Sequence, residues 1–176
     1  IATAIEIDPF SEIAYHLKGF TFYIEEKYKE AIQCFEKSLE LKPDFSAPLL
    51  YWGISLLLLN RPDEALNYFQ QLPDDQPSLL TKLGGVTLAQ IVLKNDSAAE
   101  KGIQELEAAR QSASMERAMQ LLILCRILQN EQDMAMQLIA ESIQQRLPMM
   151  IYLFTDPMLK SLRKLPQFQQ WLQEII

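Results

Sequence analysis

Apolar residues along this chain recur every three or four positions, which is the spacing of one face of an α-helix. Alternating apolar and polar runs flanked by hairpin turns, which would indicate β-strands, are absent from the sequence. The pattern therefore predicts an all-α fold. The predicted helices cover Ser11–Glu25, Tyr28–Leu41, Ala47–Leu59, Asp63–Leu72, Ser78–Leu93, Ala98–Gln111, Met115–Leu128 and Glu131–Gln145.

Identical residues recur at one fixed spacing in the first half of the chain. Four pairs stand 34 residues apart: Pro9 and Pro43, Gly19 and Gly53, Ala31 and Ala65, Phe35 and Phe69. This period is the length of one helix–turn–helix repeat. A single repeat of this kind cannot bury its own apolar face, so it stacks on its neighbours. The period predicts a solenoid of about four helical pairs plus a C-terminal capping tail.

The prolines mark the boundaries of the predicted helices. Proline belongs after a helix C-terminus or in a first turn, because it lacks an N–H and fixes φ. Together with the period, these positions divide the chain into a repeat array and a tail. The array covers 1–147 with repeats at 12–45, 46–77, 78–112 and 114–147, and the capping helices cover 148–176. Residues 1–10 match the end of a repeat, which predicts a truncated repeat and a larger parent protein.

The third repeat fits the pattern less well. Residues 85–88 resemble those that begin at Gly19 and Gly53, which makes Gly85 their counterpart. On that alignment the turn at 94–97 is lengthened by an insertion of about five residues, with Asp96 or Ser97 as the N-cap of the next helix.

Small residues recur where the two helices of a repeat are expected to cross. Gly19, Gly53 and Gly85 are predicted at crossings between the two helices of their own repeats, since any side chain there would hold the axes apart. Ala31 and Ala65 play the same part from the second helix of each pair. Large apolar residues such as Phe35 and Phe69 then fill the space beside these crossings.

These residues resemble the signature of the tetratricopeptide repeat family. Residues 12–45 depart from the signature at two positions: Ser38 stands where the family usually has alanine, and Lys18 where it prefers leucine. Residues 46–72 match the signature at Gly53, Ala65 and Phe69. The resemblance is loose over 78–147. It implies a right-handed α-α superhelix that acts as a non-catalytic protein–protein interaction module. The signature positions of the first repeat hold Tyr15, Gly19, Phe22, Tyr28, Ala31, Phe35 and Pro43.

The resemblance also implies a binding groove, because the first helix of each pair lines the concave surface in this family. The matching positions form an apolar and aromatic set: His16, Phe20, Tyr23, Tyr51, Ile54 and Leu58. Family members that clamp a terminal carboxylate carry Lys, Asn and Arg there, so this set disfavours such a clamp. Either the set binds a protein or peptide segment, or it is core covered by other repeats or by the tail.

Other functional classes find little support in the sequence. The formal net charge of −7 disfavours direct nucleic-acid binding, and the apolar run at 47–59 is too short to span a membrane. His16 is the only histidine, and no metal-ligand spacing, phosphate-binding loop or nucleophile motif is present. The sequence thus predicts no catalysis, no metal and no cofactor. The separated Cys34 and Cys125 suit a reducing compartment, which predicts a cytoplasmic location.

The segment after the repeats has features of its own. Residues 155–172 resemble the closing segment after helical repeats in bacterial signalling and transcription-regulator proteins. Asp156 is the predicted N-cap of a short helix that begins at Pro157. The last helix carries an apolar stripe predicted to pack on the second helix of the fourth repeat, against Leu138, Ile139 and Ile143. The stripe comprises Phe168, Trp171, Leu172, Ile175 and Ile176.

Two functional hypotheses follow. The first is an interaction module from a larger bacterial protein, which binds a protein or peptide segment in an apolar groove and could also form a homo-oligomer. The second is a regulatory or sensory module of a multidomain transcription regulator or signalling protein, whose effector domain lies outside this chain. The apolar groove fits both hypotheses, and the closing segment favours the second.

Overall fold

The computed structural model describes residues 8–75, 78–112 and 115–175, and every regular element in these ranges is a helix. The predicted all-α helical-repeat solenoid is confirmed. The predicted helix end at residues 1–7, the break at Pro77 and the last stripe residue Ile176 lie outside the described residues, as does the side chain of Ile175.

Eight of the described helices form four consecutive pairs, and the rest form the tail. The pairs are α2 (Glu12–Ile24) with α3 (Tyr28–Leu41), α4 (Ala47–Leu58) with α5 (Pro62–Gln70), α6 (Ser78–Val92) with α7 (Asp96–Ala109), and α8 (Met115–Leu128) with α9 (Gln132–Gln144). The tail contains α10 (Met150–Thr155), the short 3₁₀ helices η1 (Pro157–Leu159) and η2 (Leu162–Lys164), and α11 (Pro166–Ile175).

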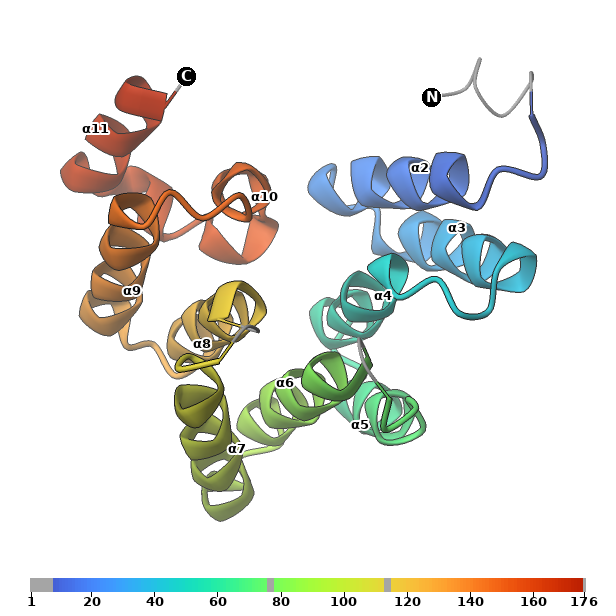
Figure 1. Ribbon diagram of the computed structural model, residues 1–176, viewed down its shortest axis with the longest axis horizontal. Helices are drawn as coiled ribbons and strands as arrows, with labels where there is room; N and C mark the ends of the chain where they lie inside the picture. The colour runs from blue at the N-terminus through green and yellow to red at the C-terminus, as the bar shows by residue number, and fades with distance from the viewer. Residues whose placement is uncertain (1–7, 76–77, 113–114, 176) are drawn as a thin grey trace.

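The pairs follow one another along an arc (Figure 1). From α4 on, each first helix packs both on its own partner and on the second helix of the preceding pair, so that the apolar core runs through the whole array. The first helices α4, α6 and α8 line the inner side of the arc, and α10 continues that row (Figure 1). The second helices lie on the outer side.

The turn inside each pair has the same construction in all four units. Three residues join the two helices, and the middle one has a positive φ of 58–61°. The next amide donates to a carbonyl five residues back, as in the bond from Lys27 N to Phe22 O of 2.8 Å. This is a Schellman motif, which satisfies the carbonyls left free at a helix end. The residues with positive φ are Glu26, Asn60, Lys94 and Asn130.

These turns correct the expected alignment of the third unit. Lys94 follows Asn60 by 34 residues, so the turn carries no insertion, and the lengthened turn predicted at 94–97 is wrong. On the true register Thr87, not Gly85, is the counterpart of Gly53. The N-cap prediction is wrong as well. The turn geometry makes Asp96 the first helical residue, and Asn95 occupies the cap without a side-chain hydrogen bond.

Two of the predicted glycine crossings are confirmed. A Cβ atom on Gly19 would lie 2.6 Å from a ring carbon of Phe35, and one on Gly53 would lie 2.0 Å from Cζ of Phe69. Carbon atoms this close would clash, so only glycine allows α2 to approach α3, and α4 to approach α5, at these points.

Gly85 makes a different contact from the one predicted. A Cβ atom there would lie 2.1 Å from Cδ1 of Phe69, which belongs to the preceding pair. The Phe69 ring therefore lies between Gly53 on α4 and Gly85 on α6. Inside the third pair the close approach is made instead by Gly102 on α7, where a Cβ atom would lie 2.0 Å from Oγ1 of Thr87.

The tail is joined to the core by aromatic residues. Phe168 on α11 is fully buried, with its ring 5.2 Å from the ring of Phe154 in an edge-to-face arrangement. Trp171 is 9% exposed. Leu138 and Ile139 are buried in the same core, while their direct contact with the stripe stays a prediction. The predicted cap of the short helix is confirmed, because Asp156 accepts a bond of 2.9 Å from the amide of Met158.

Candidate functional site

The six residues predicted to line the groove differ in how far the rest of the chain covers them. Tyr23 and Ile54 are fully buried and Tyr51 is 6% exposed, whereas the other three are partly exposed. The ring of Phe20 lies 4.8 Å from that of Tyr51, and the rings of Tyr23 and Tyr51 are 5.2 Å apart. The structure thus gathers the aromatic residues into one cluster. The partly exposed members of the set are His16, Phe20 and Leu58.

The tail covers this aromatic cluster at the C-terminal end of α2. The ring of Tyr152 on α10 lies 5.5 Å from the ring of Phe20. The Tyr23 hydroxyl donates a hydrogen bond of 2.7 Å to Asp156 Oδ1, across 133 residues of sequence. A buried hydroxyl needs such a partner, since an unpaired one costs free energy. An ion pair between Lys160 and Glu26 closes the same contact at the surface.

Asp156 is an unusual buried carboxyl group. Burial raises its pKa to about 6, although the Tyr23 hydroxyl, the Met158 amide and the charge of Arg163 all favour the ionised form. The Arg163 guanidinium donates to the main-chain oxygen of Asp156 at 2.6 Å. The Oδ2 atom of Asp156 is buried without a hydrogen-bond partner among the described residues. The contact between the tail and α2 therefore holds a group that titrates near neutral pH.

This shift predicts a pH dependence that Asp156→Asn removes. Because burial raises the pKa from 3.8 to about 6, the folded protein binds the proton more tightly between these values, and this group's contribution to the free energy of unfolding falls by about 2–3 kcal/mol as the pH rises through them. Urea denaturation of both proteins near pH 4 and near pH 7 measures the difference. The free energy of unfolding of the parent minus that of Asp156→Asn should fall by this amount between the two pH values, and a value that stays constant or rises would contradict the prediction.

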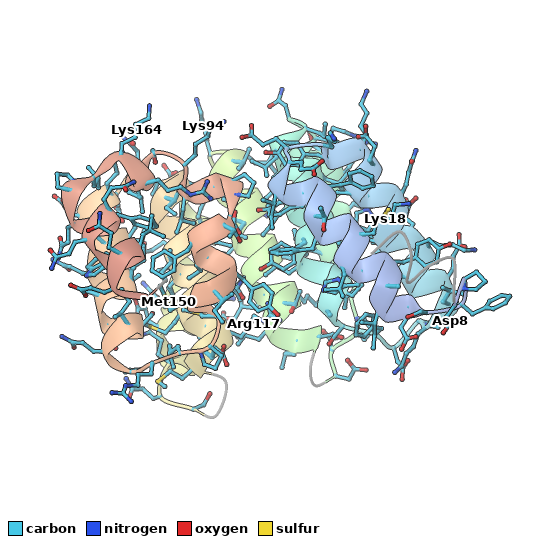
Figure 2. All side chains as sticks on the ribbon, turned by 90° about the horizontal axis from the view of Figure 1, so that it is seen from above. Asp8, Lys18, Lys94, Arg117, Met150 and Lys164 are labelled. Carbon is cyan, nitrogen blue, oxygen red and sulfur yellow. The ribbon has the colours of Figure 1, made fainter. Side chains whose placement is uncertain are left out.

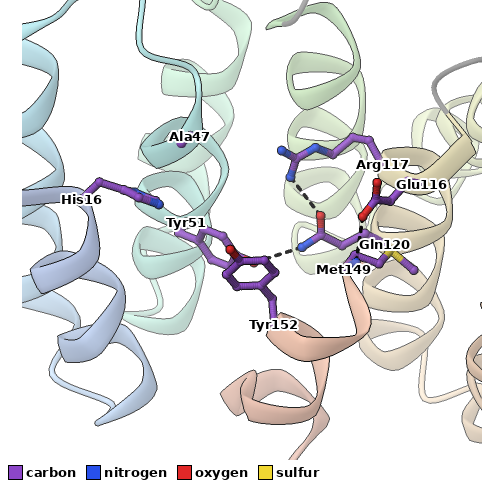
Figure 3. A pocket seen from close by; sticks show the side chains of 8 residues that line it. All are labelled: His16, Ala47, Tyr51, Glu116, Arg117, Gln120, Met149 and Tyr152. Atoms are coloured by element: carbon purple, nitrogen blue, oxygen red, sulfur yellow. Dashed lines mark hydrogen bonds between the residues drawn. The ribbon is translucent and has the colours of Figure 1, made fainter. Parts of the chain in front are cut away.

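Beside the covered part, the concave surface holds a cavity of about 290 Å³ (Figure 3). Side chains from α2, α4, α8 and α10 line it, together with the residue before α10. In the view from above, Arg117 lies between the tail helices and α2 (Figure 2). Of the residues that line it, only His16 and Tyr51 belong to the groove set predicted from the sequence. The lining residues are His16, Ala47, Tyr51, Glu116, Arg117, Gln120, Met149 and Tyr152.

A chain of hydrogen bonds crosses the cavity wall. The Gln120 amide donates a bond of 3.0 Å to the Tyr51 hydroxyl, and Arg117 Nη1 donates a bond of 2.9 Å to Gln120 Oε1. Glu116 Oε1 accepts a bond of 2.7 Å from the amide of Met149. These bonds join α4 to α8 and α8 to the start of the tail. The cavity is therefore held open by fixed polar side chains.

His16 faces this network from the opposite wall. Its ring and the Arg117 guanidinium point toward one another across the cavity (Figure 3). Its Nδ1 atom is buried with no hydrogen-bond partner among the described residues. Burial lowers the pKa of His16 to about 4, so the imidazole is neutral at neutral pH. His16 therefore contributes no positive charge to the cavity at neutral pH.

A comparison with protein families bears on the first helical pair. Residues 13–45, which cover almost all of α2 and α3, match the model of the tetratricopeptide repeat. The chain carries a tetratricopeptide repeat. A search of curated proteins finds no match to the chain. The resemblance of the closing segment to bacterial regulators and the cytoplasmic location stay predictions.

The tetratricopeptide repeat suggests a module for interactions between proteins. In the part of the chain that the structure describes, no three His, Cys, Asp or Glu side chains lie close enough to hold a metal ion, and no helix could cross a membrane. Both thiols are buried, and burial raises the pKa of Cys125 to about 12. These thiols therefore stay protonated and poorly reactive at neutral pH.

Proposed function

We propose that this repeat array binds a protein or peptide segment on the part of its concave surface that the tail leaves open. The observation that carries the proposal is the cavity between α2 and the tail, with exposed apolar side chains on both sides of it. Tyr152 lines the cavity from α10 and is 49% exposed. On α2, Leu17 follows His16 directly and is 44% exposed, and Ile13 is 53% exposed.

Further exposed apolar side chains lie on the same two helices or just before α2. In the described part of the chain, these elements carry most of the exposed large apolar residues. Exposed apolar side chains concentrated on a few elements favour an interaction site there. The residues are Phe10, Ile13, Leu17, Ile24, Ile151 and Tyr152.

The size of the cavity fits side chains inserted by a protein segment. Pockets for small ligands usually enclose about 300–1,000 Å³ and bury most of the ligand. The cavity here, at about 290 Å³, is at the lower end of that range and has room for one or two side chains. A segment that lies across α2 and α10 would insert these side chains and cover the apolar surface around them.

Replacement of Leu17 by serine is expected to weaken such binding about three- to tenfold. Full burial of a leucine side chain contributes about 1.5–3 kcal/mol, and 44% of Leu17 is left for a partner to bury. Peptides are first selected from a random phage-displayed library on the parent protein, and their Kd is then measured by fluorescence anisotropy. Met134→Ser is the matched control, since Met134 is 43% exposed on the outer helix α9. Equal binding to the parent, Leu17→Ser and Met134→Ser proteins would place the site elsewhere.

A further inference from the structure

Arg117, in the cavity wall, lacks the carboxylate partner that two other half-buried arginines have. Arg163, which is half-buried and has no ion pair among the described residues either, donates instead to the main-chain oxygen of Asp156 at 2.6 Å. Arg110, with 21% of its side chain exposed, pairs with Glu107 at 2.7 Å and with Glu141 at 2.6 Å. Arg126, with 12% exposed, pairs with Glu131 at 2.9 Å. Arg117 is half-buried too, yet no described carboxylate lies within ion-pair distance of it. Among the described residues, its side chain donates only to the neutral amide of Gln120.

A half-buried guanidinium without a counter-ion is costly, because it has lost part of its hydration without gaining an opposite charge. In this chain acidic residues outnumber basic ones, 23 to 16, so carboxylates are abundant. Arg117 nevertheless points into the cavity, toward His16 (Figure 3). A carboxylate that entered the cavity would supply the missing charge.

We propose that the bound segment presents an acidic side chain to Arg117, with apolar residues beside it that cover Leu17 and Tyr152. This inference rests on the proposed function and names the chemistry of the partner. Arg117 offers charge-assisted hydrogen bonds to a carboxylate, which are stronger than bonds between neutral groups. The neutral ring of His16, on the opposite wall, adds no charge that would compete with this pairing.

Glu116, the one carboxylate among the lining residues, does not reverse this preference. Its oxygen already accepts the amide of Met149 at 2.7 Å, so it is held toward the tail. Glu116 is also exposed, whereas Arg117 is half-buried. Water and salt screen an exposed charge more than a half-buried one. The positive charge of Arg117 therefore dominates inside the cavity, while Glu116 disfavours a second acidic group.

The test compares peptides selected from a random phage-displayed library on four proteins: the parent, Arg117→Gln, Arg117→Glu and Lys101→Gln. Lys101 is the charge-matched control, because its side chain is 80% exposed on α7 and lies outside the cavity. Asp and Glu should be enriched in peptides selected on the parent and on Lys101→Gln. The enrichment should vanish with Arg117→Gln and change to Lys and Arg with Arg117→Glu. Thermal melts of each protein establish that all four are folded.

One selected peptide then gives the coupling between the two groups. Its acidic residue is replaced by the matching amide, and Kd is measured by fluorescence anisotropy against the parent and Arg117→Gln. Each single change should weaken binding about tenfold, and both together should cost little more than one alone. Peptides that require Leu17 but show no acidic enrichment, or independent effects of the two changes, would overturn this inference and leave the proposed function intact. Peptides that do not require Leu17 would overturn both.

Discussion

Replacement of Phe69 by alanine is expected to lower the free energy of unfolding by about 3–5 kcal/mol. The ring is fully buried and fills the space between Gly53 on α4 and Gly85 on α6. A cavity left in a core costs more when its walls cannot move in to fill it. Both walls here are glycines, which have no side chain to turn into the space. Urea denaturation followed by circular dichroism measures the loss.

The same packing predicts how a second substitution combines with the first. Gly53→Ala alone adds a Cβ atom 2.0 Å from the ring and should cost about 1–3 kcal/mol through overpacking. In the double variant the added methyl group enters the space that the ring has left. The two losses should therefore add up to more than the loss of the double variant. Additive losses, or a Phe69→Ala protein as stable as the parent, would show that the ring is not held between the glycines.

Replacement of Phe168 by alanine is expected to cost a similar amount, about 3–5 kcal/mol, and to release the tail. The ring is fully buried against Phe154 and near Trp171, with ring centres 5.2 Å and 6.3 Å away. The helix that carries it has only 10 residues, and isolated helices of that length are marginal in water. Without the ring, α11 loses the packing that keeps it folded.

Two measurements separate a released tail from a general loss of stability. Urea denaturation gives the free energy, and hydrogen exchange shows where protection is lost. Exchange should quicken most in residues 150–175 and at the C-terminal end of α2, which the tail covers. Gln170→Ala is the control, since Gln170 is exposed on the same helix. Unchanged exchange in the tail of the Phe168→Ala protein would contradict the anchoring role.

The sequence predicted the first two pairs closely because the residues that set their packing are also the residues that repeat. Gly19 with Phe35, and Gly53 with Phe69, are both the periodic residues and the contacts at the helix crossings. The predicted range of α3, Tyr28–Leu41, agrees with the structure. Where one residue type serves one packing role, its spacing shows the architecture.

The third pair was misaligned because glycine serves two different roles in this array. The alignment placed Gly85 opposite Gly53 because both are glycines. Gly85 in fact accommodates Phe69 of the preceding pair, and Thr87 is the residue that corresponds to Gly53. The turn that would have settled the register gives no signal in the sequence. Its residue with positive φ is Lys94, where glycine would be the usual choice.

Only part of the candidate site could be read from the sequence. His16 and Tyr51 lie on helices that the repeat pattern identifies. Arg117 and Gln120 lie on α8, in a unit with few signature residues. Gln120 bonds to Tyr51, and Arg117 to Gln120, only because the array curves. Curvature is the sum of small rotations between neighbouring pairs, which no local pattern of residues specifies. The hydrogen bond from Tyr23 to Asp156 depends on the same rotations between pairs.

The bond between Tyr23 and Asp156 has a consequence for how this chain can change its length. An open array gains or loses a pair of helices at little cost, because each pair contacts only its neighbours. Here the pair α2–α3 also contacts the tail, because the Tyr23 hydroxyl lies 2.7 Å from Asp156 Oδ1. This distance depends on the rotations between all the pairs that lie between these two residues. One extra pair would carry Asp156 away from Tyr23 and leave both polar groups without their partner. Contact between α2 and the tail therefore fixes at four the number of pairs from α2 to α9, as closure fixes the number of subunits in a ring.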